Sequence, residues 1–202
     1  MKVAVLGASG RAGSEITREL AARGHAVQAI ARHPEAIPVA DGVTPVAGDA
    51  ADPAALAALI RGSDAVISAL HFDVTADTLL SVLRQAGVGR LLVTGGAASL
   101  EVAPGQRLFD SPDFPAEWKP IAAAGIAFLE ALRDERAIDW TFFSPAALIE
   151  EGPRRGHYRL GGDRLVTDEA GESRISFADY AIAMVDELER GAHPRARFTA
   201  AY

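Results

Sequence analysis

The 202-residue sequence contains no cysteine, which excludes disulfide bonds, thiolate metal sites and cysteine nucleophiles. It also contains no apolar run of about 18 residues, the length that a membrane-spanning helix needs. Its first apolar stretch, Val3 to Leu6, is too short for the core of a signal peptide. We therefore expect a cytoplasmic protein without a membrane partner.

Basic residues are outnumbered and scattered along the chain. Lys and Arg total 20 against 27 Asp and Glu, so the formal net charge is -7 and no basic patch marks a nucleic-acid interface. The composition, 49% hydrophobic and 23% charged, is that of a globular protein. We expect residues 1–202 to fold as a single domain, monomeric or homodimeric, that does not bind nucleic acid.

Short apolar segments alternate with amphipathic segments along most of the chain. The apolar segments are rich in β-branched residues, as in strands buried on both faces, and the amphipathic segments have helical spacing. Interleaved strands and helices pair in parallel through right-handed crossovers, so the sequence predicts an α/β doubly wound parallel sheet. The predicted strands are residues 2–6, 25–31, 43–47, 65–69, 90–94, 140–143 and 197–201, and the predicted helices are 11–23, 53–61, 75–86, 121–136 and 177–190.

Three of these helices have recognisable first residues. Asp52 precedes a proline at the first helical position, Thr75 leads the third helix, and Ser176 stands three residues before Asp179 at the last one. These side chains are predicted to cap the helices.

Two segments interrupt the alternation. Residues 95–120 are rich in glycine and proline and follow a strand end, where ligands bind in this architecture, so we expect them to form a wall of the active site. Residues 152–171 are also rich in glycine and contain two short β-like pieces, 157–160 and 164–167. These pieces are predicted to form a hairpin over the site, as a small C-terminal elaboration on the substrate side.

Gly7, Gly10 and Gly13 follow the first predicted strand and open the first helix. In this context the first glycine permits a tight turn, the second lets the backbone approach a pyrophosphate, and the third lets helix and strand pack closely. Free N–H groups at the helix start then face the phosphate charge. The pattern predicts a Rossmann-type dinucleotide site, the alternative being a glycine turn without a ligand.

The end of the second predicted strand bears on coenzyme choice. A site for NAD places a carboxylate there to accept hydrogen bonds from the ribose, but this sequence has Arg32. Arg32 and Arg11 could form charge-assisted bonds to a 2′-phosphate, which favours NADPH and leaves NADH possible, or both could be solvated surface residues. Asp49 could accept a bond from the adenine amino group or cap the following helix, for which Asp52 is better placed.

Several longer motifs run from one end of the chain to the other. They are GASGRAGSEI, AVISAL, LLVTGGAASLEVAPG, SPDFPAEWKP, DWTFFSPAAL, YRLGGDRLV, SRISFADYA and RFTAAY. On these motifs the chain resembles the atypical short-chain dehydrogenases of the NADH-flavin reductase group, an NAD(P)H-binding family related to the biliverdin and flavin reductases.

The resemblance implies which residues contact the coenzyme, beyond the three glycines. It places Thr94 and Gly95 at the nicotinamide end, and Ser144, Pro145 and Ala146 against the carboxamide. The remaining implied contacts are Ser9, Arg11, Ala12, Arg32, Asp49, Ala69 and Leu70.

The chain departs from the best-known short-chain dehydrogenases because their Tyr-x-x-x-Lys pair is absent. The only lysines are Lys2 and Lys119, and the region around Lys119 reads PAEWKP, without a tyrosine. Reduction of a carbonyl to an alcohol needs such an acid-base group, whereas a flavin can take its proton from solvent. The resemblance and this departure together favour an NAD(P)H-dependent oxidoreductase whose substrate is a flavin or another planar acceptor, with no catalytic residue identified.

Four further residues are candidates for the substrate site. His71 follows the fourth strand and could donate a proton or be a solvated loop residue. Phe109 and Trp118 in the long loop could stack on a planar ring or pack the loop down. Tyr158 could cover the pocket or be a half-buried hairpin residue. No third ligand joins His71 and Asp73, so no metal site is expected.

A protein of another class also fits this sequence. A sensor that binds NAD(P)H without turnover and reports the redox state to a partner would need the same glycine turn and no acid-base pair. The sequence therefore leaves open whether the small-molecule acceptor is reduced at all.

Overall fold

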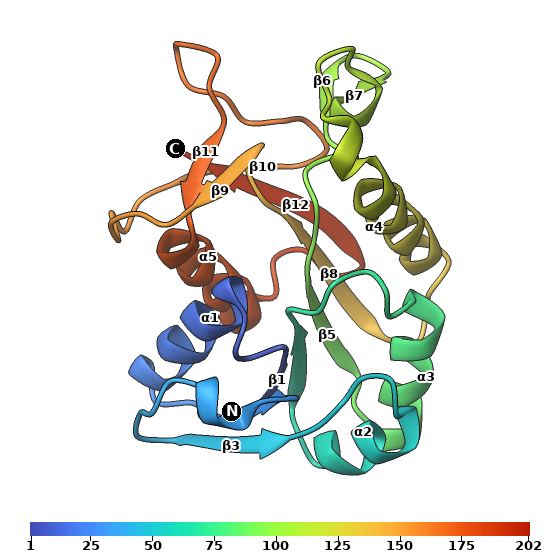
Figure 1. Cartoon of the computed structure of the whole chain (residues 1–202), viewed down its shortest axis with the longest axis vertical. Coiled ribbons are helices and arrows are strands. Elements are labelled where there is room, and N and C mark those ends of the chain that lie inside the picture. The colour runs from blue at the N-terminus through green and yellow to red at the C-terminus, as the bar shows by residue number, and fades with distance from the viewer.

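The computed structural model describes all residues, 1–202. Its centre is an eight-stranded sheet with the order β10-β12-β8-β5-β4-β1-β2-β3, in which every neighbouring pair is parallel except β10 and β12 (Figure 1). This confirms the predicted doubly wound α/β fold. The strands are β1 Lys2–Leu6, β2 Ala26–Ala31, β3 Val43–Ala47, β4 Ala65–Ser68, β5 Arg90–Thr94, β8 Asp139–Ser144, β10 Arg159–Gly161 and β12 Ala196–Ala201.

Five α-helices cover the two faces of the sheet. Apolar residues of α1 and α5 pack on one face and those of α2, α3 and α4 on the other, and Figure 1 shows the two groups on opposite sides. None of these helices combines the length and the apolar character needed to cross a membrane. The helices are α1 Arg11–Ala22, α2 Pro53–Ile60, α3 Ala76–Ala86, α4 Lys119–Arg133 and α5 Phe177–Arg190.

The three predicted caps are present. The side chain of Asp52 accepts from Ala55 N at 3.0 Å, and Thr75 Oγ1 accepts from Thr78 N at 3.3 Å. Ser176 Oγ accepts from Asp179 N at 3.1 Å. Each bond satisfies an N–H group that the first turn of a helix leaves without a partner.

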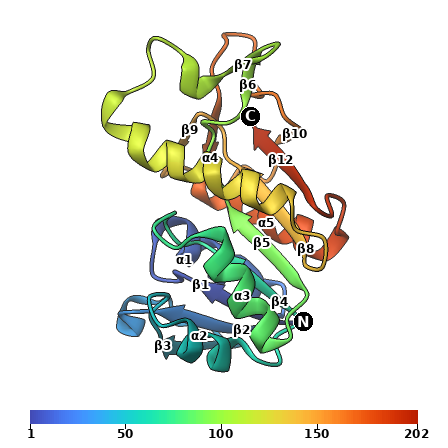
Figure 2. The same cartoon turned by 90° about the vertical axis from the view of Figure 1, so that its right-hand side faces the viewer.

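The chain reverses its direction of travel across the sheet between β1 and β4. From β1 it proceeds outward to β2 and β3, and it then returns to place β4 and β5 on the other side of β1. Such a switch point opens a crevice at the carboxyl ends of the strands, where ligands of doubly wound proteins bind. Figure 2 shows the segment between β5 and α4, with β6 and β7, beyond the carboxyl end of β5.

The long segment after β5 is ordered into small elements. It contains a short antiparallel hairpin and two 3-10 turns, and α4 begins two residues before the predicted start. The hairpin is β6 Glu101–Ala103 with β7 Gln106–Arg107, the turns are Leu108–Asp110 and Ala116–Trp118, and a further 3-10 turn, Pro34–Ala36, follows β2.

The predicted hairpin between residues 157–160 and 164–167 is wrong. β10 instead pairs with β12, Arg159 opposite Ala201 and Gly161 opposite Thr199, while Arg164 forms only an isolated bridge to Glu101. The reason is that β12 would otherwise leave a row of unpaired N–H and C=O groups at the sheet edge. A small two-stranded sheet, β9 Leu148–Glu150 with β11 Arg174–Ser176, completes the C-terminal elaboration.

Candidate functional site

A cavity of about 590 Å³ lies at the carboxyl ends of β1, β4, β5 and β8. Of the 28 residues that line it, 16 are hydrophobic, as in pockets for small organic ligands. The glycine turn and the start of α1 form one side, and α4 with the segment before it forms another. The only ionisable side chains in the lining are those of Arg11, His71 and Asp113.

The three glycines of the turn have distinct steric roles. Gly7 has φ +76°, and a Cβ there would lie 2.6 Å from the carbonyl oxygen of Ala69. A Cβ on Gly13 would lie 2.1 Å from the Gly7 carbonyl oxygen. Gly10 differs, because its Cβ would meet only the Gly7 oxygen at 3.3 Å, and it lines the cavity. Gly7 and Gly13 thus build the turn, and Gly10 leaves room beside it.

The beginning of α1 presents unpaired hydrogen-bond donors. Its N-cap, Gly10, offers no side chain, and its first turn carries no acidic residue. The N–H groups of Ser9, Arg11, Ala12 and Gly13 donate to no backbone carbonyl. Oriented N–H groups with the positive end of a helix dipole attract phosphate. The residues present therefore fit the pyrophosphate of a dinucleotide.

Arg11 and Arg32 are both free of carboxylate partners. The Arg11 guanidinium carbon lies 5.1 Å from the ring centroid of Phe177, at the edge of the cavity. Arg32 is exposed just beyond β2 and does not line the cavity. Asp49 does not cap α2, since Asp52 does so, and its Oδ1 accepts from Ala51 N at 2.9 Å. Its second oxygen has no partner within the chain.

The strand-end residues implied for the nicotinamide end gather around the cavity. Gly95 packs tightly, since a Cβ there would lie 2.3 Å from the Phe142 ring. Ser144 does not line the cavity, because its side chain is fully buried and its Oγ lacks a hydrogen-bond partner. Those that do line it are Ala69 and Leu70 after β4, Thr94 at the end of β5 with Gly95 after it, and Pro145 and Ala146 after β8.

The four substrate-side candidates occupy different places. His71 and Trp118 line the cavity. Phe109 does not, but its ring packs against Phe114, which does, with centroids 5.5 Å apart. Tyr158 lies away from the cavity, and its hydroxyl donates to Asp186 Oδ2 at 2.6 Å. The hairpin that would have carried it over the site does not form, because β10 joins the sheet edge.

No tyrosine or lysine lines the cavity. Burial and the bond to Asp186 raise the pKa of Tyr158, and Tyr202 donates to Asp179 at 2.6 Å. Tyr180 is buried beneath the site, where burial raises its pKa well above the ordinary value and its hydroxyl donates to the Phe143 carbonyl oxygen at 2.8 Å. All three tyrosines of the chain are therefore held in structural bonds outside the cavity.

Sequence reasoning missed the part of the acceptor side that α4 contributes. In α4, Ile121, Ala122, Gly125 and Ile126 line it at helical spacing, a periodicity visible in the sequence. A Cβ on Gly125 would lie 2.8 Å from the Phe72 ring, which brings α4 close to the loop after β4. The segment 95–120, predicted to form a wall of the site, also contributes Gly96, Ala97, Ala98, Ser99, Leu108, Ser111 and Pro115, and further lining residues outside any predicted part of the site are Ala147, Ile149 and Phe177.

A switch-point cavity with a glycine turn and free N–H groups defines a dinucleotide-binding protein of the Rossmann type. Comparison with known families agrees, since the family described as NAD(P)H-binding matches residues 7–188. The chain therefore belongs to the NAD(P)H-binding family, with the fold of an atypical short-chain dehydrogenase.

Relatives that match over nearly the whole chain also share much of its sequence. The uncharacterized protein YwnB of Bacillus subtilis (strain 168) is 43% identical over 210 residues, covering 98% of this chain and 97% of YwnB. A candidate exported protein from Burkholderia pseudomallei is 45% identical with a TM-score of 0.91, and each chain is covered completely. A candidate NADH-flavin reductase from Streptococcus pneumoniae TIGR4 is 40% identical with a TM-score of 0.85, covering 100% of this chain and 99% of that one.

Proposed function

We propose that this protein is an NADPH-dependent reductase that holds the dihydronicotinamide against a planar acceptor, most simply a flavin. Its membership of the NAD(P)H-binding family supports an NAD(P)H-dependent oxidoreductase. The similarity to a candidate NADH-flavin reductase, at 40% identity over the whole chain, supports a flavin as the acceptor.

One observation carries the proposal: the cavity contains no tyrosine or lysine to relay a proton. Its ionisable side chains are Arg11, His71 and Asp113, of which His71 can donate a proton but stands without the tyrosine-lysine pair of the short-chain dehydrogenases. Reduction of a ketone requires a proton donor at the carbonyl oxygen, and a positioned general acid contributes about 10²–10⁴-fold to such a step. A flavin or quinone places less demand on the protein, because its reduced form takes a proton from water.

The side chains and backbone of the site then act by binding and orientation. The free N–H groups at the start of α1 hold the pyrophosphate, and the strand-end residues after β4, β5 and β8 orient the nicotinamide ring. When bound, NADPH supplies a hydride, two electrons with one proton, to the acceptor, which takes its second proton from solvent as NADP⁺ is formed. The apolar wall of α4 excludes water from the contact between the two rings.

The choice of NADPH over NADH rests on the two arginines without carboxylate partners. Arg32 stands where NAD-dependent proteins carry a carboxylate, and Arg11 lies on the first turn of α1. An arginine that is not already paired can form a forked bond to a 2′-phosphate without breaking another ion pair.

Steady-state oxidation of NADPH tests this proposal against the sensor alternative. The purified protein is assayed under anaerobic conditions with riboflavin, FMN, FAD and quinones, and NADPH binding is measured by calorimetry on the same preparation. We expect acceptor-dependent oxidation well above the uncatalysed rate. Tight NADPH binding with no turnover above background for any acceptor would instead establish a sensor.

A further inference from the structure

The acceptor half of the cavity is the apolar wall formed by α4 and the segment before it, on which the aromatic side chain of Trp118 is exposed. Its largest side chains are Phe72, Phe114, Trp118, Ile121 and Ile126. Trp118 is 53% exposed and Ile121 is 46% exposed, although both line the cavity. Large apolar side chains left this open at a cavity mouth form a stacking surface for a planar ligand.

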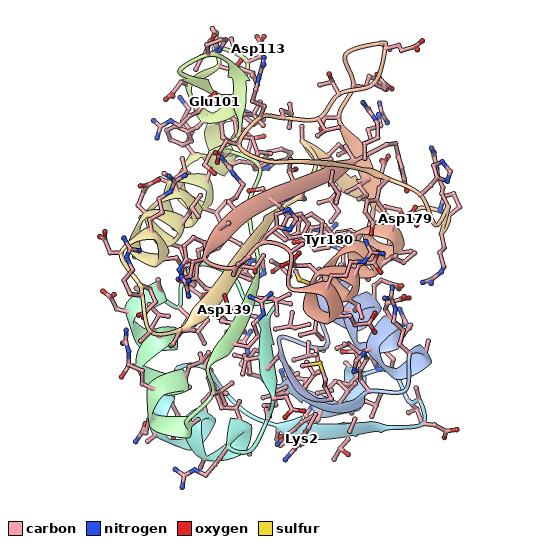
Figure 3. The ribbon with its side chains drawn as sticks, turned by 180° about the vertical axis from the view of Figure 1, so that it is seen from behind. Lys2, Glu101, Asp113, Asp139, Asp179 and Tyr180 are labelled. Carbon is pink, nitrogen blue, oxygen red and sulfur yellow. The ribbon has the colours of Figure 1, made fainter.

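The same wall is poor in positive charge. The one charged residue that this wall adds to the cavity lining is Asp113. Residues 101–120 carry four carboxylates and two cations, and one of these cations, Arg107, is bound to Asp110 at 2.9 Å. Figure 3 shows Asp113 and Glu101 at the same end of the molecule.

The remaining cation of this segment, Lys119, does not line the cavity and stands two residues from Glu117. The first turn of α4 is preceded directly by the 3-10 turn Ala116–Trp118, which carries Glu117. Phosphate sites are built from Arg, Lys or free helix N-termini. The start of α4 offers few free donors, because the Lys119 N–H donates to the Ala116 carbonyl oxygen and Pro120 has no N–H. With its excess of carboxylates, this rim opposes a phosphate rather than attracting one.

We infer that the acceptor is an uncharged planar ring system, such as riboflavin or an unsubstituted quinone, and that phosphorylated or sulfonated analogues bind more weakly. This inference rests on the proposed function and names its substrate class. Two pairs of ligands separate the effect of the ring system from the effect of the charge, because the members of each pair differ only in a charged group. The pairs are riboflavin with FMN, and a naphthoquinone with its sulfonate. An unfavourable contact between unit charges about 4 Å apart, screened as in bulk water, changes affinity by about fivefold.

Intrinsic fluorescence gives a binding readout that is independent of turnover. The chain has two tryptophans, of which Trp140 is buried and Trp118 is exposed at the cavity mouth. Each ligand is titrated into the protein saturated with NADP⁺, and quenching of Trp118 is followed. Trp118→Phe should lose the signal, whereas Leu160→Ala, which removes apolar surface that is 52% exposed but lies outside the cavity, should keep it.

We expect the uncharged member of each pair to bind at least about fivefold more tightly, with the ratio narrowing at high salt and in Asp113→Asn. Steady-state NADPH oxidation with the same four acceptors should follow the same order. If FMN or the sulfonate binds and reacts as well as its uncharged partner, the inference is wrong while the reductase proposal stands. If none of the four quenches Trp118 or is reduced, although NADPH binds, both fail.

Discussion

Arg32 is the charged side chain that leaves β2 where the ribose of a bound dinucleotide is expected, and it is exposed without an ion pair. Replacing it with alanine therefore breaks no internal contact and should leave the free energy of unfolding nearly unchanged. A charge-assisted bond to the 2′-phosphate contributes about 1.5–3 kcal/mol, or roughly tenfold to more than a hundredfold in affinity. Because Arg32 is exposed, we expect the alanine variant to lose binding affinity near the lower end of this range, and to lose it for NADPH alone.

Isothermal titration calorimetry with NADPH and NADH measures this loss directly. Arg32→Ala should weaken NADPH by about tenfold and leave NADH unchanged. Arg11→Ala reports whether the arginine beside Phe177 shares the phosphate. Arg61→Ala is the matched control, since Arg61 is exposed at the end of α2, before β4, and so lies at the amino ends of the strands, away from the cavity at their carboxyl ends. Equal wild-type affinities for NADPH and NADH, within about twofold, would refute the reasoning.

Two further predictions concern stability. Gly95→Ala puts a Cβ 2.3 Å from the Phe142 ring and should lower the free energy of unfolding in urea by about 1–3 kcal/mol, whereas Gly89→Ala, with open space around its Cβ, should change it little. At Asp179, burial favours a raised pKa, but bonds from Tyr202 and from two N–H groups outweigh it and lower the pKa. The contribution of the Asp179 carboxylate to the free energy of unfolding is therefore full above about pH 4 and is lost as the pH falls through the lowered pKa. Asp179→Asn should lack this part of the acid-induced loss, which urea titrations at several pH values from 7 to 3 would measure.

The sheet could be predicted because its physical signals are local. A parallel strand buried on both faces is a continuous apolar run, and β1, β4 and β5 are such runs closed by glycine or polar residues. The caps at Thr75 and Ser176 are also local, since each side chain bonds the N–H three residues ahead.

The contribution of α4 to the acceptor side could not be predicted, because it depends on contacts between distant segments. The contact of Phe72 with Gly125 joins the loop after β4 to α4, and the amphipathic pattern of α4 does not reveal that part of its apolar face lines a cavity. The position of Tyr158 outside the cavity has a similar cause. Its segment has the pattern of a hairpin, but pairing with β12 carries β10 to the sheet edge.

The glycine turn could be identified from the sequence, because a position without room for a Cβ must be glycine. Gly7 and Gly13 are required by close backbone contacts, whereas Gly10 lines the cavity and a Cβ there would meet only the Gly7 oxygen. The coenzyme contacts themselves stay predictions, as do the cytoplasmic location and the oligomeric state.

The central claim is that a nicotinamide dinucleotide binds with its pyrophosphate beside Gly10, and Gly10→Val tests it most directly. The new Cβ would lie 3.3 Å from the Gly7 oxygen, a close contact that a shift of a few tenths of an ångström relieves, and the side chain would enter the space where we expect the phosphates. Gly162→Val is the control, because a Cβ there meets nothing within 4 Å. Calorimetry should show NADPH affinity at least about a hundredfold weaker in Gly10→Val and unchanged in Gly162→Val, with both variants folded. A folded Gly10→Val that binds NADPH like the wild type would contradict the account.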